Sequence, residues 1–171
     1  IDDRRYHDIF RESVNRIHTM ALIHTMLYQS ENLSFIDLSD YIGSITSNIA
    51  SMYSREAAKI NVSVVTDDIR FDVDTAIPCG LIINELVSNA FKYAFPGDVA
   101  GRITITFIDN GDNSITLSVA DTGVGLPHAI DLQSVESLGL KIVKLLAEQQ
   151  LGGTIGLRRD EGTEFIIQFK R

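Results

Sequence analysis

The sequence predicts an α/β fold, a two-layer sandwich in which a mixed, mostly antiparallel sheet of about five strands is covered by about three helices. Two segments with helical periodicity come first, and strand-like and helix-like segments then alternate along the chain. The clearest strand-like segments form an antiparallel hairpin around the turn DNGDN. We therefore expect a helical arm over residues 1–58 and an α/β domain over residues 59–171.

Composition and charge restrict the function. The 171 residues are 44% hydrophobic and 22% charged, which suits one globular core with a helical appendage. No apolar run is long enough to cross a bilayer, so we expect no membrane contact from this chain. The net charge of −8 argues against nucleic-acid binding, but it allows an anionic nucleotide held by backbone N–H groups and a few cations.

Cys79 is the single cysteine, which excludes an internal disulfide and fits a reducing compartment. We therefore expect a cytoplasmic location, with the full-length protein either soluble or membrane-anchored.

The first predicted helix carries an apolar stripe whose spacing alternates between four and three residues. That spacing is typical of a heptad seam and predicts packing against partner helices. We expect His24, on this seam, to be packed between helices. After a break at residues 30–35, Asp37 is expected to cap a second helix. The seam consists of Phe10, Val14, Ile17, Ala21, His24 and Tyr28.

The remaining elements follow from the alternation of apolar and polar residues. Asp74 is the predicted N-cap of a helix over residues 75–94, which Pro96-Gly97 ends, and residues 138–148 predict another helix. The expected strands are centred on residues 62–64, 69–71, 103–107, 115–119, 155–157 and 165–169.

The stretch NELVSNAFKYAF, residues 84–95, combines asparagines and charges with an otherwise helical pattern. Asparagine is a poor residue for a helix interior, because its amide competes for backbone hydrogen bonds. Glu85, Ser88, Asn89 and Lys92 share one face at helical spacing. Two interpretations remain open: an ordinary solvated helix face, or an acid, an amide and a cation directed at one ligand.

Three glycine-containing segments add to that ligand hypothesis. DTGVGLP, residues 121–127, follows a strand, and its glycines allow a close backbone approach to a ligand. SLGL, residues 137–140, opens a helix whose unpaired N–H groups suit a phosphate. Gly162-Thr163 lies in the last turn. Each segment alone is also explained as a simple turn or loop.

Taken in order, these four segments resemble the ATP-binding domain shared by histidine kinases, Hsp90, MutL and type II topoisomerases, which has the Bergerat-type fold. The resemblance covers residues 60–171. It implies that Asn89 coordinates a Mg²⁺ ion bridging the phosphates, that Lys92 contacts phosphate, and that Glu85 is the catalytic acid–base or polarising group.

The same resemblance implies the remaining ATP contacts. Asp121 would accept a hydrogen bond from the adenine amino group, with Gly123 and Gly125 beneath the base. The backbone at Gly139 and Leu140 would meet the phosphates, and Thr163 would complete the adenine end. Flanking residues expected at the nucleotide are Tyr93, Leu126, Ser137, Leu138 and Gly162.

The arm narrows the resemblance to one histidine-kinase subfamily. RIHTMALIHTMLYQSENLSFIDLSDYI, residues 16–42, is similar to the end of the dimerisation region in kinases whose acceptor motif is His-Arg-Val-Lys-Asn-Asn. None of His7, His18, His24 and His128 stands in such a motif, so autophosphorylation of this chain alone is not expected. The implied function is a sensor histidine kinase that forms a homodimer and passes phosphate to an aspartate of a response regulator receiver domain.

Other functions of the same fold stay open. An anti-sigma-type serine kinase would share the ATP site, but the helical arm argues against it. An ATP-gated clamp resembling MutL or Hsp90 is expected to carry a further transducer domain. A scaffold that holds ATP without transfer is disfavoured by the presence of Glu85 and Asn89.

Overall fold

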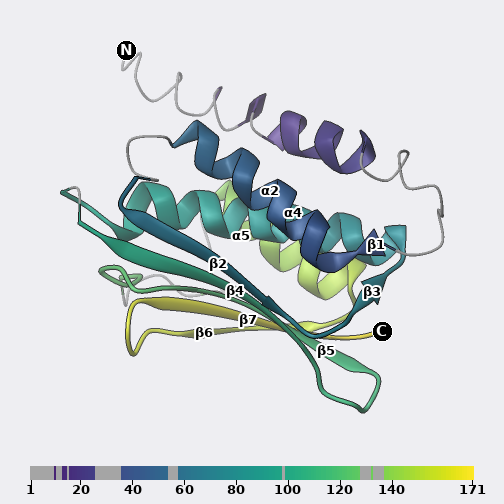
Figure 1. The fold of residues 1–171 in the computed structure, drawn as a ribbon. Helices are drawn as coiled ribbons and strands as arrows, with labels where there is room; N and C mark the ends of the chain where they lie inside the picture. The colour runs from purple at the N-terminus through teal and green to yellow at the C-terminus, as the bar shows by residue number, and fades with distance from the viewer. Residues whose placement is uncertain are drawn as a thin grey trace.

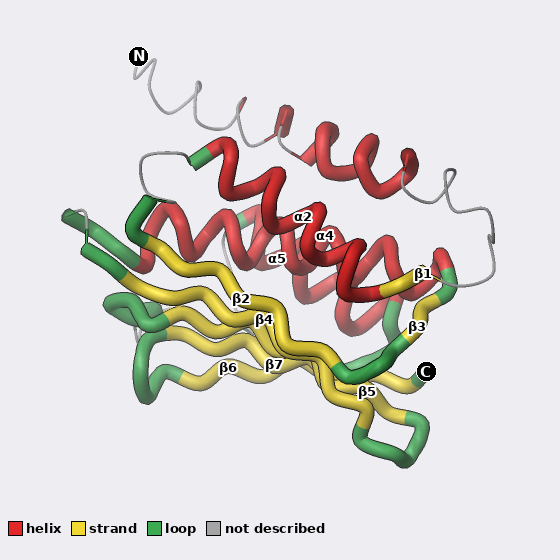
Figure 2. Tube along the Cα trace, in the orientation of Figure 1, coloured by secondary structure: helices red, strands yellow, loops and turns green. Residues whose placement is uncertain are grey.

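The computed structural model describes residues 10, 13–14, 16–25, 36–53, 58–97, 99–127, 132 and 137–171. Figures 1 and 2 show a sheet with its helices on one face, and α4 packs between α2 and α5. The predicted two-layer sandwich is confirmed. The elements are β1 (Ile36–Asp37), α2 (Leu38–Met52), β2 (Ile60–Thr66), β3 (Arg70–Phe71), α4 (Val73–Asn89), η1 (Ala90–Ala94), β4 (Gly101–Asp109), β5 (Ser114–Asp121), α5 (Leu138–Leu145), η2 (Leu146–Gln150), β6 (Thr154–Arg158) and β7 (Thr163–Lys170).

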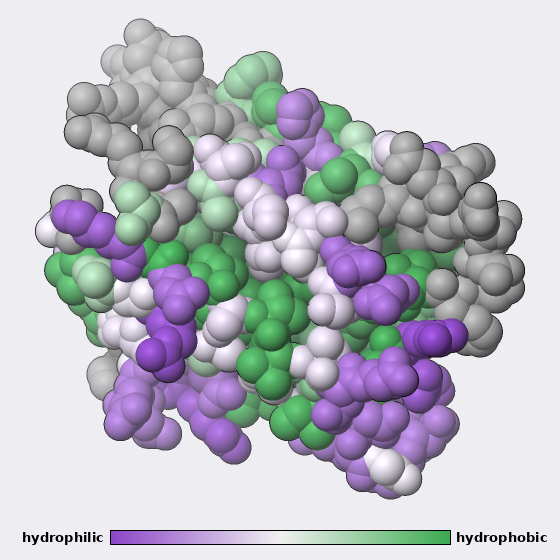
Figure 3. Space-filling model, in the orientation of Figure 1, coloured by the Kyte–Doolittle hydropathy of each residue, from purple (hydrophilic) through white to green (hydrophobic). Residues whose placement is uncertain are grey.

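The main sheet has five strands in the order β2-β4-β5-β7-β6. The predicted hairpin is β4–β5, in which Ile105 pairs with Val119 and Phe107 with Leu117. Among the strands in the described part of the chain, only β2 and β4 pair in parallel. Figure 3 shows hydrophilic side chains over the β4–β5 turn, as expected for its exposed polar residues. The strand expected at residues 69–71 is reduced to β3, which pairs with β1 in a separate small sheet.

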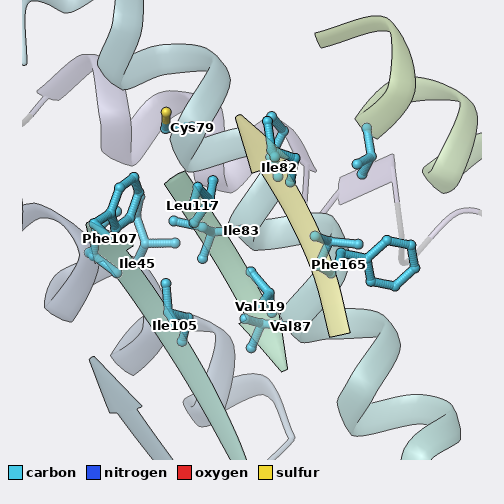
Figure 4. Packing of buried hydrophobic residues seen from close by; sticks show 14 of the residues in the cluster. Ile45, Cys79, Ile82, Ile83, Val87, Ile105, Phe107, Leu117, Val119 and Phe165 are labelled. Atoms are coloured by element: carbon cyan, nitrogen blue, oxygen red, sulfur yellow. The ribbon is translucent and has the colours of Figure 1, made fainter. Parts of the chain in front are cut away.

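The core fills the space between the helices and the sheet. Figure 4 shows Ile83 and Val87 of α4 against Ile105 of β4 and Val119 of β5. The alternate positions on the strands, such as Thr104, are only half-buried. This alternation arises because neighbouring side chains on a strand point to opposite faces of the sheet.

The start of α4 differs from the prediction. Asp72, not Asp74, is the N-cap, and its Oδ1 accepts a hydrogen bond of 2.9 Å from the Thr75 backbone N–H. Asp74 lies within the first helical turn, where a carboxylate also interacts favourably with the helix dipole. Two aspartates two residues apart both suit a helix start, and β3 ends just before Asp72.

The helix expected over residues 75–94 is present and ends at Ala94 as predicted, but its last turn is of a different type. The α-helix ends at Asn89 and continues as the π-helical turn η1, and the last helix likewise passes into η2. Such turns are rare, occur often at functional sites and have no propensity signal in a single sequence.

The helical segment at residues 16–25 lies on the helix layer, on the side away from the sheet (Figure 1). Ile23 is buried, whereas the seam residues Phe10, Ile17 and His24 are exposed. His24 is therefore not packed between helices within one chain, because the segment packs through a different face; its packing against a partner helix stays a prediction. Tyr28, His7, His128 and the break at 30–35 lie outside the described residues. No helix in the described ranges is long and apolar enough to span a bilayer.

Candidate functional site

The polar face of α4 forms one wall of a small cavity. Asn84 and Glu85 are buried, at 3% and 7% exposure. The interpretation of an ordinary solvated face is therefore wrong for the first turn of this stretch. The cavity is lined by Arg16, Tyr53, Asn84, Glu85, Ser88, Asn89 and Lys92, so the structure brings the predicted acid, amide and cation together.

Glu85 is held by an arginine that is 69 residues away in the sequence. Arg16 Nε donates to Glu85 Oε1 at 2.5 Å, and Arg16 Nη2 donates to Glu85 Oε2 at 2.9 Å. Two parallel N–H···O bonds of this kind fix the orientation of a carboxylate as well as neutralising it. The side chains are only 16% and 9% exposed, so solvent screens this pair weakly.

Asn84 has a structural contact of its own. Its Oδ1 accepts a hydrogen bond of 2.8 Å from the Thr19 hydroxyl, and both residues are buried. This contact explains one of the unusual asparagines in the helix, because Asn84 joins α4 to the arm. Glu85, Ser88, Asn89 and Lys92 of this stretch also line the cavity.

The first turn of α5 lies next to the polar face of α4. A Cβ atom added to Gly139 would lie 2.7 Å from Glu85 Oε2 and 3.9 Å from Asn89 Nδ2, so a side chain at this position would displace the Glu85 carboxylate. The N-cap Ser137 makes no side-chain capping bond, and Leu140 is buried and anchors the helix. The predicted SLGL segment is therefore next to the α4 face.

A second cluster lies at the end of β5. Asp121 pairs in register with Thr163 of β7, and both side chains are buried. Asp121 Oδ1 accepts a hydrogen bond of 2.9 Å from the Gly123 backbone N–H. Burial raises the pKa of the Asp121 carboxyl, and hydrogen bonds from Gly123 and Thr163 oppose this shift in part.

The glycines of this cluster are required by close backbone contacts. An added Cβ on Gly123 would lie 2.2 Å from the Ala94 carbonyl oxygen, and one on Gly162 would lie 2.0 Å from the Asp121 carbonyl oxygen. Gly125 and Gly162 have φ values of +78° and +90°, which side chains disfavour. The Val124 N–H also donates to Ala94 O, so the DTGVG turn is attached to the end of η1.

The two clusters lie at the two ends of one helical turn. Asn89 ends α4 and Ala94 ends η1, so the two positions are five residues apart along the helix. One end offers a buried carboxylate beside glycine backbone, and the other an amide, cations and helix N–H groups. This arrangement suits a ligand with a hydrogen-bonding ring at one end and phosphates at the other.

The other predicted residues lie at the margins. Tyr93 and Leu138 are 65% and 61% exposed, and Leu126 is partly buried against the core. His18 and His24 are exposed, and neither lines the cavity. The described residues contain no group of three His, Cys, Asp or Glu side chains suited to a metal, which leaves Asn89 as the predicted metal ligand.

Sequence reasoning missed Arg16 and Tyr53 as site residues. Arg16 is the first residue of the arm segment over residues 16–42, but neither its apolar spacing nor its resemblance to a dimerisation region indicates a role in the site. Tyr53 lines the cavity and stacks on Phe91 of η1, with ring centroids 5.2 Å apart and an interplanar angle of 4°. Neither contact has a local sequence signal, since both partners are distant in the chain.

Comparison with known proteins gives two family matches. The family described as "Histidine kinase-, DNA gyrase B-, and HSP90-like ATPase" matches residues 74–171, and a family described as "Histidine kinase" matches residues 1–53. The sensor histidine kinase PdtaS of Mycobacterium tuberculosis is 33% identical over 162 residues, covering 92% of this chain and 31% of that protein.

Two further comparisons involve Erythrobacter litoralis. Its blue-light-activated histidine kinase 2 is 31% identical over 150 residues, covering 83% of this chain and 42% of that protein. The solved histidine kinase domain of its EL346 blue-light activated histidine kinase superposes with a TM-score of 0.81 at 26% identity, covering 93% of this chain and 74% of that one. The chain thus spans less than half the length of these curated relatives.

Proposed function

Because the chain belongs to the family of histidine kinase-, DNA gyrase B- and HSP90-like ATPases, we propose that it binds Mg-ATP and transfers the γ-phosphate to a histidine on a separate helix. The phosphate would then pass to an aspartate of a response regulator. The observation that carries this proposal is the pair of clusters at the two ends of η1: Asp121 with its glycines at one end, and Glu85 with Asn89 at the other.

The cluster around Asp121, at the end of η1, has the groups needed to bind adenine. The Asp121 carboxylate accepts hydrogen bonds, so it would accept one from the exocyclic amino group, while the backbone at Gly123 and Gly125 approaches the ring. Thr163, Gly162 and Leu126 would border the base. Support comes from the burial of Asp121 and from the turn at Gly123 and Gly125, which close backbone contacts hold against Ala94 and Gly162.

The cluster around Asn89 and Lys92, at the start of η1, has the groups needed to bind Mg²⁺ and phosphate. Mg²⁺ takes oxygen ligands and keeps several waters, so the Asn89 side-chain oxygen with phosphate oxygens is a sufficient ligand set. When bound, the ion would neutralise negative charge on the phosphates. Lys92 would add a cation, and the N–H groups of residues 137–140 would face the phosphates, with Tyr93 and Leu138 at the margin.

Glu85 would act on the nucleophile. An imidazole that attacks phosphorus must lose a proton, and a carboxylate beside the phosphate end can accept or orient that proton. Its position beside Asn89 in the cavity supports this assignment.

The test is transfer to a separately prepared helix that carries a His-Arg-Val-Lys-Asn-Asn motif. With labelled ATP, we expect acid-labile, base-stable phosphate on the added helix and none on the chain itself, because His18 and His24 lie outside the cavity. Transfer between separate molecules should be slow, because it lacks the effective concentration that linkage provides.

The matched variants are Glu85→Gln and, as a control, Glu148→Gln on the exposed side of η2. Glu85→Gln should slow transfer about tenfold or more without weakening ATP binding, because its role is in the transition state. Equal rates for the two variants would remove Glu85 from the mechanism. Phosphate on a serine of a partner protein would favour the anti-sigma-type kinase, and slow hydrolysis without transfer would favour a plain ATPase.

A further inference from the structure

We propose that Arg16 binds the terminal phosphate of the nucleotide, so that the helical arm supplies one residue of the ATP site. The proposal rests on the function proposed above, in which Asn89, Lys92 and the first turn of α5 receive the phosphates. It makes the preference of the site for ATP over ADP depend on the arm.

The position of Arg16 supports this role. Its guanidinium lines the same cavity as Asn89 and Lys92. A Cβ atom added to Gly139 would lie 3.5 Å from Arg16 Nη2, 3.9 Å from Asn89 Nδ2 and 2.7 Å from Glu85 Oε2. Arginine, amide and carboxylate therefore surround one point at the start of α5, where the terminal phosphate is expected.

Charge gives the reason for an arginine there. A bare carboxylate beside a triphosphate would repel it, and Glu85 is only 9% exposed, so water screens its charge little. Arg16 neutralises Glu85 through Nε and Nη2. A guanidinium keeps its charge at all physiological pH values, has five N–H groups, and suits phosphate as well as carboxylate.

The arm is held in place by contacts other than the ion pair. Thr19 bonds to Asn84, and Ile23 packs closely over Gly80. Residues 16, 19 and 23 share one helix face and follow α4 in the opposite direction, toward residues 85, 84 and 80. Removing the guanidinium should therefore leave the arm docked.

Titration calorimetry with Mg-ATP, Mg-ADP and adenosine tests the proposal. For Arg16→Ala we expect the affinity for Mg-ATP to fall about ten- to a hundredfold, as for a lost charged hydrogen bond. The loss should be smaller for Mg-ADP and absent for adenosine. Arg16→Lys should recover part of the ATP affinity, because lysine keeps the charge but not the fork.

Two control variants distinguish a role of Arg16 in nucleotide binding from a role in docking the arm onto α4. Thr19→Ala removes the other polar contact between the arm and α4, and Arg158→Ala removes an arginine from an exposed ion pair on β6. Both should bind the three ligands as the parent does. Equal losses for all three ligands in Arg16→Ala would show that Arg16 only docks the arm. Unchanged or tighter ATP binding would reject the proposal. If Arg16→Ala no longer weakens ATP binding once Glu85 is replaced by Gln, Arg16 acts only by neutralising the Glu85 carboxylate. A parent chain that binds Mg-ATP no better than adenosine would instead reject the proposed function.

Discussion

At the residue scale, the adjacent residues Asn84 and Glu85 of α4 make different kinds of contact. Asn84 is turned into a buried contact with Thr19, whereas Glu85 reaches the cavity and pairs with Arg16. Both are buried polar groups, which a protein tolerates only when their hydrogen bonds are satisfied from elsewhere in the fold. Asp121 is a third such residue, and its environment leads to a prediction about pH.

Base recognition should depend on the ionised form of Asp121. Burial raises the pKa of this carboxyl, so it takes up a proton at a higher pH than an ordinary aspartate does. Adenosine affinity should therefore fall as the pH drops through that raised pKa. Asp121→Asn should bind adenosine weakly at every pH and lose the preference over guanosine.

The exposed Asp160→Asn in the β6–β7 turn is the control, with a pH profile like that of the parent. Calorimetric titrations from acidic to neutral pH would measure these profiles. The same pKa shift has a consequence for stability: the folded state binds more protons, so this group makes folding less favourable as the pH rises from its unfolded to its folded pKa. A parent profile that matches Asp121→Asn would rule out this carboxylate as the adenine reader.

At the scale of elements, α4 is the centre of the molecule. One face covers the sheet, a second carries the site, and a third is crossed by α2 and the arm. That crossing depends on Gly80, because an added Cβ would lie 2.2 Å from the Tyr41 hydroxyl, 2.9 Å from Ile23 Cδ1 and 3.0 Å from Ile45 Cδ1. The Tyr41 hydroxyl donates to Ala76 O at 2.8 Å, so it is not free to move away.

Gly80→Ala should destabilise the fold by about 1–3 kcal/mol, because overpacking outweighs the gain in helix propensity. The matched control is Gly43→Ala in α2, where no atom lies within 4 Å of the added Cβ. That variant should gain up to about 1 kcal/mol from propensity alone. Urea denaturation would measure both. If both Gly80→Ala and Gly43→Ala stabilise the fold, then α2 and the arm can shift to accommodate a methyl group at position 80.

At the scale of the whole molecule, the arm has two unlike faces. Arg16, Thr19 and Ile23 face α4, whereas Phe10, Ile17 and Met20 are 71%, 63% and 51% exposed. An exposed apolar stripe with heptad spacing suits a partner helix, and a second copy of the chain is the partner proposed for it. The ATP site and the dimer contact would then use opposite faces of one helix.

Self-association should therefore depend on Ile17 and increase with protein concentration. Ile17→Lys should shift the monomer–dimer equilibrium toward monomer, because it buries a charge in the seam. Val65→Lys changes a similarly exposed apolar residue of β2, at 55%, and should leave the equilibrium unchanged. Sedimentation equilibrium would compare them. A parent that stays monomeric at all concentrations would reject the seam as a dimer contact.

The sequence by itself determined those features whose cause is local. Alternation at residues 103–119 predicted the central hairpin, and the glycines at 123, 125, 139 and 162 marked the places where the backbone comes close. The grouping of Glu85, Asn89 and Lys92 followed from the helical period alone. The domain boundary near residue 58 and the role of each site residue remain predictions.

Tertiary structure decided what depends on residues distant in the chain. The choice of Asp72 over Asp74 as N-cap, the π-turn after Asn89 and the exposure of His24 each follow from how elements pack together. The pairing of Arg16 with Glu85 across 69 residues is the clearest case. The sequence around Arg16 does not show which residue it pairs with, because the contact forms only when the arm helix lies along α4. The physical reason is that periodicity shows which face of a helix is buried, whereas only packing shows what covers it.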